Sequence, residues 1–204
     1  GRLEGGVALV FRHGSGRARL YLVCQPAMGD TFRGAGAAER FIAACAGAFP
    51  DGSLARARAV GPVAFFPGAD LFSSRIAGDG IVLVGDAAGA NDPSQGLGLS
   101  LALRDVRELS ALLRSSDWVE AAAEFARRRP SWYEPLRAFA IWQGPLFTDT
   151  GPVADAARAR AARAAELDPW RDGYGALHAL GPDGLPVTEA ARRHFLGEDL
   201  DEAQ

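Results

Sequence analysis

The sequence predicts an α/β protein of the α+β type, with a mixed or antiparallel β-sheet region followed by a strand–loop–helix unit and C-terminal helices. Two β-prone runs at residues 7–11 and 20–23 flank a Gly-Ser-Gly turn, as in a β-hairpin. An apolar run at 81–84 leads through a glycine-rich loop into a helical pattern. From residue 118 onward the patterns are mainly helical.

The N-terminal third contains the predicted sheet region and one helix. After the hairpin, the glycine content of residues 29–36 indicates a loop. Residues 37–49 show the spacing of a helix with one apolar face. Residues 60–66 have the composition of a further strand, and Pro62 indicates a sheet edge or the start of a strand.

The central segment has the order strand, glycine-rich loop, helix. Residues 81–84 form a short apolar run, which is typical of a strand buried on both faces. Small residues follow as far as Gly98, and a helix is predicted to begin at Leu99 with its charged residues on one side. The side that we expect to be buried consists of Leu99, Ala102, Leu103, Val106, Leu109 and Leu113.

The C-terminal region is predicted to be helical. Residues 118–140 form either one long helix or two helices interrupted at Pro130 or Pro135. Residues 153–167 have strong helix propensity, and a short helix is expected at 189–195. The packing residues expected in the long segment are Phe125, Trp132, Leu136 and Phe139.

The composition is that of a soluble globular protein and argues against several function classes. The chain has 204 residues, of which 48% are hydrophobic and 23% charged, and its formal net charge is −3. We therefore expect no nucleic acid partner, and no apolar run reaches the ~20 residues that span a bilayer, so we expect no membrane partner. Cys24 and Cys45 lack metal-ligand spacing and are interpreted as thiols buried in a cytoplasmic protein, with no metal site.

The residues of the central loop suit a ligand that carries both hydroxyl groups and a planar ring. Asp86 follows a strand, where open α/β sheets bind ligands, and its carboxylate accepts hydrogen bonds from hydroxyl groups. Gly96, Gly98 and Ser100 open the helix, so a flat ligand can approach the positively polarised backbone N–H groups. Reduced flavin fits this chemistry. Phosphate also suits a helix N-terminus, so these residues alone leave both ligands open.

Residues 80–106 resemble the second flavin-binding motif of the FAD-dependent monooxygenases related to p-hydroxybenzoate hydroxylase. They have a strand, Gly-Asp, an Ala pair, a Pro, glycines and a helix that bears an Asp, in that order. Weaker similarity extends over residues 60–140. The residues that resemble one subgroup of this family are Gly89, Asn91, Asp92 and Arg104.

This resemblance implies an incomplete FAD-binding Rossmann-type domain made of its closing strand, loop and helix. Residues 1–78 would be part of a substrate-binding β-sheet region, 79–115 the second FAD-binding motif, and 116–204 a C-terminal helical region. Within the sheet region, residues 20–23 and 63–66 would roof the substrate site.

The resemblance also implies which residues bind FAD. Asp86 would bind the ribityl hydroxyls, Ala87 would contact the ligand near the pyrophosphate through its backbone, and Pro93 would lie beside the isoalloxazine ring. Asp105 would stabilise its helix instead of touching the ligand. Backbone N–H groups of Gly98, Leu99 and Ser100 would face the flavin N1 and O2. The implied cofactor-binding residues are Gly85, Asp86, Ala87, Pro93, Gly96, Gly98, Leu99 and Ser100.

The implied function is that of an NAD(P)H-dependent monooxygenase, which reduces FAD, captures O2 and hydroxylates an aromatic or other small organic substrate. The flavin carries this chemistry, so no catalytic side chain is assigned. A flavoprotein reductase or halogenase of the same superfamily is an alternative. A further alternative is a non-catalytic interaction domain on a flavoprotein scaffold.

One part of the family pattern is missing from the sequence. Members begin with a GxGxxG unit that holds the ADP half of FAD, whereas the nearest string here, Gly14-Ser15-Gly16, lies in the predicted hairpin. The chain thus resembles the C-terminal portion of such an enzyme. We expect it alone to bind FAD weakly or not at all and to be inactive. It would pair with the missing N-terminal half or self-associate through the open edge of the strand at 81–84.

Overall fold

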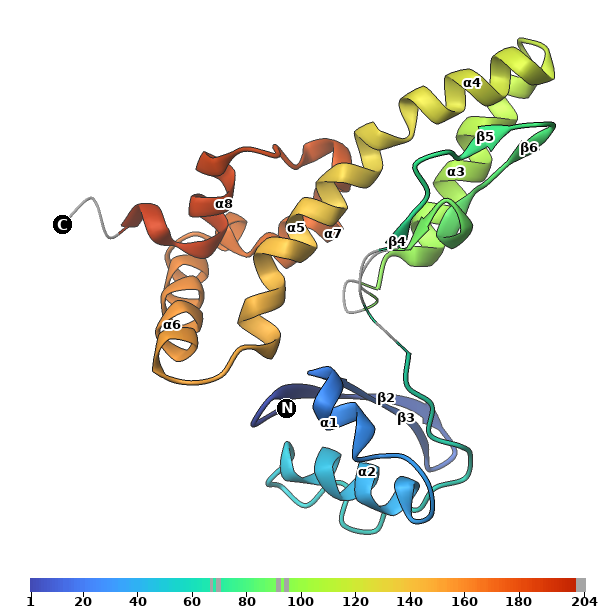
Figure 1. Cartoon of the computed structure of the whole chain (residues 1–204). Helices are drawn as coiled ribbons and strands as arrows, with labels where there is room; N and C mark the ends of the chain where they lie inside the picture. Colours follow the sequence, from blue (N-terminus) through green and yellow to red (C-terminus); the bar gives the residue numbers. More distant parts are fainter. Residues whose placement is uncertain (67, 69–70, 91–92, 94–95, 201–204) are drawn as a thin grey trace. The chain divides into compact units, whose positions relative to one another are not determined.

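The computed structural model describes residues 1–66, 68, 71–90, 93 and 96–200. It combines helices with small antiparallel sheets, which confirms the predicted α+β class (Figure 1). The chain forms two compact units. Unit 1 contains Gly1–Pro67 and Gly144–Ala156, and unit 2 contains Gly68–Gln143 and Ala157–Gln204. From its sequence, the chain is predicted to divide after residues 78 and 115 into three functional regions. This division stays a prediction.

The sheet of unit 1 has three antiparallel strands in the order β1 (Arg2–Leu3), β2 (Gly6–Gly14) and β3 (Arg17–Cys24). This confirms the predicted hairpin. Ser15 and the glycines on either side of it all have positive φ, which is the backbone that a tight hairpin turn requires.

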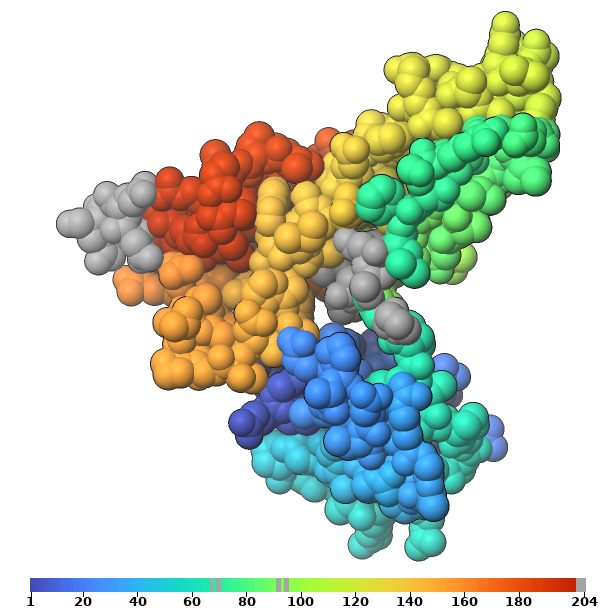
Figure 2. All heavy atoms as spheres, viewed as in Figure 1, coloured from blue at the N-terminus to red at the C-terminus, as the bar shows by residue number. Residues whose placement is uncertain are grey.

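The helix α2 (Ala37–Gly47) packs on this sheet, and the atoms of α1 (Pro26–Asp30) and α2 lie in front of much of it in the space-filling view (Figure 2). The predicted helix at 37–49 is confirmed, and part of the predicted loop at 29–36 belongs to α1 instead. The strand predicted at 60–66 is wrong, because this segment pairs with no described strand. The buried core of unit 1 consists of Ala8, Cys45, Ala48 and Leu54.

Unit 2 begins with four two-residue strands. The strand β4 (Leu71–Phe72) pairs with β7 (Gly89–Ala90), and β5 (Ala77–Gly78) pairs with β6 (Ile81–Val82), both antiparallel. The expectation of a strand at 81–84 buried on both faces is wrong, since the strand ends after two residues and Ile81 is 62% exposed. The physical reason is that β6 has one short neighbour in the described chain and nothing that covers Ile81.

Three consecutive helices follow, α3 (Gly98–Leu113), α4 (Trp118–Arg128) and α5 (Pro130–Thr148). The two-helix form of the prediction for residues 118–140 is confirmed, with the break at Pro130, which begins α5. The four expected packing residues are all at most 2% exposed: Phe125, Trp132, Leu136 and Phe139.

The predicted buried face of α3 is wrong in part. The buried residues of this helix are Leu101 and Asp105, whereas Leu99, Leu103 and Val106 are half exposed or more. Since α4 and α5 offer polar partners to Asp105, the helix turns this carboxylate inward and leaves part of its apolar stripe outside.

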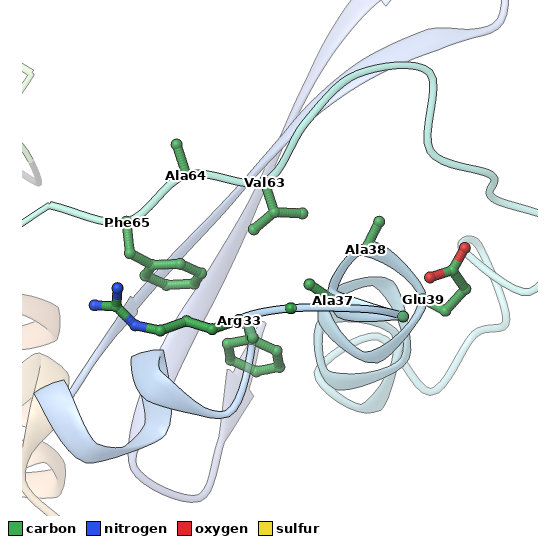
Figure 3. Close-up of a pocket in the computed structure, with 10 residues that line it drawn as sticks. Arg33, Ala37, Ala38, Glu39, Val63, Ala64 and Phe65 are labelled. Atoms are coloured by element: carbon green, nitrogen blue, oxygen red, sulfur yellow. The ribbon is translucent and has the colours of Figure 1, made fainter.

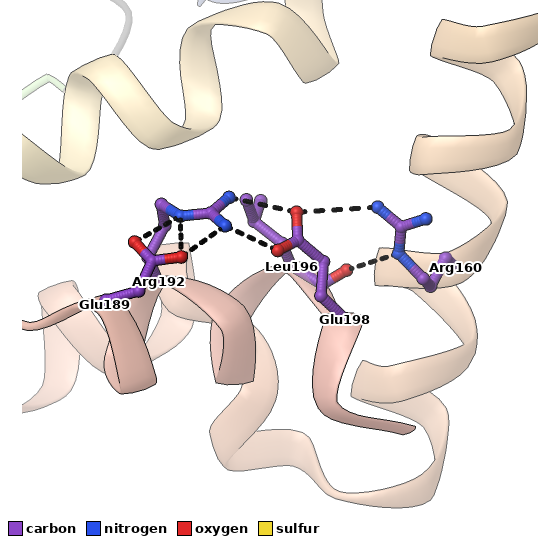
Figure 4. A network of polar contacts seen from close by, with 5 residues as sticks. All are labelled: Arg160, Glu189, Arg192, Leu196 and Glu198. Atoms are coloured by element: carbon purple, nitrogen blue, oxygen red, sulfur yellow. Dashed lines mark hydrogen bonds and ion pairs between the residues drawn. The ribbon is translucent and has the colours of Figure 1, made fainter. Parts of the chain in front are cut away.

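The last part of unit 2 contains α7 (Gly173–Leu180) and α8 (Glu189–Leu196), and α6 (Pro152–Leu167) leads into it. The predicted helices at 153–167 and 189–195 are confirmed. Figure 4 shows the ion pairs that tie α6 to α8 through Glu198: Arg192 donates to both carboxylate oxygens of Glu198, and Arg160 Nη2 lies 3.7 Å from Glu198 Oε1. Arg160 also donates to the Leu196 carbonyl at 3.2 Å.

Candidate functional site

The loop after β6 folds back closely onto α3. It forms the short helical turn η1 (Gly85–Ala87), and Gly85 has a φ of 55°. A Cβ at this position would lie 3.0 Å from the Cβ of Ala102 in α3. Both the left-handed backbone and the close approach therefore require glycine at residue 85.

The side chain of Asp86 is exposed and lies beside the start of α3. One of its carboxylate oxygens, Oδ1, is 3.7 Å from the place that a Cβ on Gly98 would occupy. No described side chain caps this helix at Leu97. The first N–H groups of a helix have no partner within it, so an acceptor group and a set of backbone donors lie next to each other at the surface.

The peptide that precedes Asp86 is held by a buried carboxylate. The N–H of Gly85 donates to Asp105 Oδ2 at 2.8 Å, and the same oxygen accepts from Arg129 Nε at 2.8 Å. The second oxygen, Oδ1, accepts from Trp132 Nε1 at 2.9 Å. Asp105 is 0% exposed, so these three bonds replace the water that a buried charge lacks.

Arg129 lies between α4 and α5 and contacts the loop a second time. Its Nη2 donates to the Gly85 carbonyl at 3.2 Å, and its guanidinium lies 4.6 Å from the ring centroid of Tyr133. Tyr133 donates from its hydroxyl to the Ala90 carbonyl at 3.1 Å and so holds β7 as well. The glycine-rich loop is thus attached to the helices at several points along its length.

The predicted site residues fall into two groups. Gly85, Asp86 and Ala87 form η1, which packs against α3, the helix that Gly98, Leu99 and Ser100 open. Pro93 and Gly96 are exposed, and no contact places them with Asp86. Of the residues that resemble the monooxygenase subgroup, Asn91 and Asp92 lie outside the described residues.

The sequence reasoning missed two residues that build the site, Arg129 and Trp132. Arg129 closes a run of three arginines, which by composition alone carries little information in an arginine-rich chain. The signal that could have found the pair is their place at Pro130, where a helix break lets side chains approach from two directions.

A separate hollow of about 620 Å³ lies in unit 1 between α2 and the segment that precedes unit 2 (Figure 3). Its lining includes Phe32, Arg33, Val63 and Phe65, and the rings of Phe32 and Phe65 stack with centroids 5.5 Å apart. Residues 63–65 were expected in a sheet that roofs a substrate site. They form no strand, and their role at a substrate site stays a prediction.

The cysteines lie in unit 1 and are free thiols. Burial raises the pKa of Cys24, and burial together with Cys24 raises the pKa of Cys45 to about 11. Among the described residues, no three His, Cys, Asp or Glu side chains are arranged to hold a metal ion. Within the same residues, no helix has both the length and the apolar character needed to cross a membrane.

Comparison with known proteins identifies no relative of this chain. No family model matches the chain, and neither a curated protein nor a solved structure matches it. The geometry around Asp86 therefore carries the functional argument by itself.

Proposed function

We infer that the chain binds the ribityl and isoalloxazine part of FAD and is a portion of an FAD-dependent oxidoreductase. The observation that carries this proposal is the exposed Asp86 carboxylate beside the N-terminus of α3, which no described side chain caps. A carboxylate accepts hydrogen bonds from the hydroxyls of a ribityl chain, and helix N–H groups favour the negative charge of a reduced flavin ring. The residues present fit the cofactor, because Gly98 leaves open the space beside Asp86 that a side chain would fill.

A structural role for Asp86 explains the geometry less well. An acidic residue at a helix N-terminus stabilises the helix by about 0.3–1 kcal/mol, and such residues commonly cap it. Asp86 makes no capping hydrogen bond to α3 and is exposed. Its carboxylate is therefore available to a ligand.

The carboxylate also argues against phosphate as the ligand. A helix N-terminus alone attracts phosphate, but here a dianion would lie next to the negative Asp86 side chain. A ligand that donates hydrogen bonds from hydroxyls is attracted by both groups, which is the reason for preferring the flavin.

The reaction class that we propose is NAD(P)H-dependent monooxygenation of an aromatic or other small organic substrate with O2. FAD supplies the redox and oxygen chemistry when bound. The residues of this chain bind the ribityl hydroxyls at Asp86 and orient the ring at the N–H groups of Gly98, Leu99 and Ser100. The ADP half of FAD needs contacts that this sequence lacks, since it contains no GxGxxG string.

The first prediction tests ligand binding at Asp86. Titration of the 15N-labelled chain with riboflavin is expected to shift the amide signals of residues 98–100 with weak affinity. Asp86→Ala removes a charged acceptor and should weaken binding by roughly 10–100-fold. Asp79→Ala serves as the control, since Asp79 is an exposed acid paired with Arg75.

The effect of Asp86→Ala on affinity also distinguishes flavin from phosphate as the ligand, because the two ligands predict changes of opposite sign. If inorganic phosphate is the ligand of the α3 N-terminus, Asp86→Ala removes a repulsion and strengthens phosphate binding while riboflavin shifts nothing. That outcome would contradict the proposal. Purification of the chain with stoichiometric yellow flavin would contradict the expectation that this chain alone holds FAD weakly.

A further inference from the structure

The buried carboxylate of Asp105 binds the N–H of Gly85, the residue that precedes the proposed ligand-binding acid, and at 0% exposure no ligand can reach it. Its three hydrogen bonds come from three different elements: the η1 loop, the α4–α5 junction and α5. Replacing a buried ion pair with apolar side chains is often neutral or stabilising, so stability alone does not explain a charge at this place. A role in holding a particular geometry does.

The hydrogen bonds fix the peptide groups on both sides of Gly85. Its N–H is bound by Asp105, and its carbonyl accepts from Arg129 Nη2 and from the N–H of Ala88 at 3.0 Å. Both acceptor positions of that carbonyl are therefore in use. Asp86 is the next residue, and its exposed side chain has no capping bond that could place it.

We propose that Asp105, with Arg129, is a positioning residue that sets where the Asp86 carboxylate lies relative to the N-terminus of α3. Without the Asp105 acceptor, the left-handed Gly85 loses the bond that selects this backbone conformation. Glycine also populates many other conformations, so the loop carrying Asp86 then moves away from α3. The affinity of the site thus depends on a residue that never touches the ligand.

The first test uses the whole chain with riboflavin as the probe. Because it measures riboflavin affinity, this test rests on the proposed function. Asp105→Asn keeps the side-chain volume but turns an N–H2 group toward one of the three donors. We expect a loss of riboflavin affinity of about 10-fold or more, because the acceptor at Asp86 is displaced. The control is Leu177→Ala, a truncation of a fully buried residue of α7 that should leave the affinity unchanged.

A double-mutant cycle distinguishes positioning from general destabilisation. In an Asp86→Ala background, Asp105→Asn should cause no further loss of affinity, since the group that it positions is already gone. If the affinity losses of Asp86→Ala and Asp105→Asn add independently in the double variant, the inference is overturned. Wild-type affinity in a folded Asp105→Asn variant overturns it as well.

Arg129→Lys keeps the test decisive if Asp105→Asn does not fold. Lysine retains a positive charge beside Asp105 but cannot also reach the Gly85 carbonyl with a second donor. The expected result is a folded protein with weakened riboflavin binding. A folded variant with unchanged binding contradicts the role of the arginine and of the ion pair.

A readout without ligand separates this inference from the proposed function. In the wild type we expect nuclear Overhauser contacts between the Asp86 β-protons and the Gly98 α-protons, and slow hydrogen exchange at the Gly85 amide. Both should be lost in Asp105→Asn, and their retention overturns the inference. If the wild type binds no riboflavin, the proposed function fails while these contacts still decide the role of Asp105.

Discussion

At the scale of single residues, the loop requires a glycine at position 85. Gly85 has a left-handed backbone and lies against Ala102, whereas Gly144 lies in the helix α5 with no neighbouring atom near its Cβ position. These two glycines therefore respond to the same substitution in opposite directions.

We predict that Gly85→Ala lowers the free energy of unfolding of the protein by about 1–2 kcal/mol or more. The left-handed conformation costs about this much for alanine, and the contact with Ala102 adds to it. Urea denaturation measures the change. Gly144→Ala is the matched control and should raise the stability by about 0.5–1 kcal/mol. Equal effects of the two variants would contradict the close packing of η1 on α3.

A second prediction concerns Cys45, which is 1% exposed. Its pKa rises from 9.0 to about 11 on folding, so the folded protein retains a proton that the unfolded chain releases between these values. The free energy of unfolding should therefore be unaffected by this thiol below pH 9 and should fall by about 2 kcal/mol as the pH approaches 11.

Urea denaturation across this pH range tests the prediction for Cys45, with Cys45→Ala as the comparison. The alanine variant should lack the part of the pH dependence that the thiol contributes. An identical slope in both proteins would show that Cys45 does not titrate as its burial requires.

At the scale of elements, α3 has two faces with different roles. Its inner face carries Leu101 and Asp105, and its outer face leaves Leu99, Leu103 and Val106 in solvent at 74%, 62% and 50% exposure. An exposed apolar stripe of this kind is typical of a surface that contacts another protein segment. The sequence predicted self-association through the edge of the strand at 81–84, or pairing with a missing N-terminal half, and both stay predictions; the stripe on α3 is a second surface for such a contact.

The prediction for α3 is that the chain self-associates reversibly as its concentration rises, and that Leu103→Gln with Val106→Gln weakens this association. Sedimentation velocity over a concentration series measures it. Val119→Gln is the control, because Val119 is 74% exposed but lies on α4, outside the stripe of α3. If the double variant associates as strongly as the wild type, the stripe on α3 is not the contact surface.

At the scale of the whole molecule, the candidate site belongs entirely to unit 2. The β-strands and α3 that carry it are joined to α4 and α5 through Asp105, Arg129 and Tyr133. Unit 1 has its own core around Cys45 and its own hollow lined by aromatic rings. The proposed flavin site is thus supported by hydrogen bonds within one unit.

The sequence by itself determined most of the local elements, whereas the ligand chemistry of the site stays a prediction. Hydrophobic period and turn residues predicted the hairpin and the helices, and they offered Pro130 as one of two places for a helix break, because these features depend on neighbours in the chain. The pattern around Asp86 and Gly98 predicted an acceptor beside a helix N-terminus for the same reason.

Only the tertiary structure decided which faces are buried and what holds the loop in place. Periodicity predicted that Leu99 and Val106 would be inside, yet the outcome was set by Arg129 and Trp132, which approach Asp105 from more than twenty residues away. The strand expected at 60–66 does not form, because this segment pairs with no described strand. Strand pairing and burial depend on contacts between residues that are distant in the sequence, and a local sequence pattern does not specify those contacts.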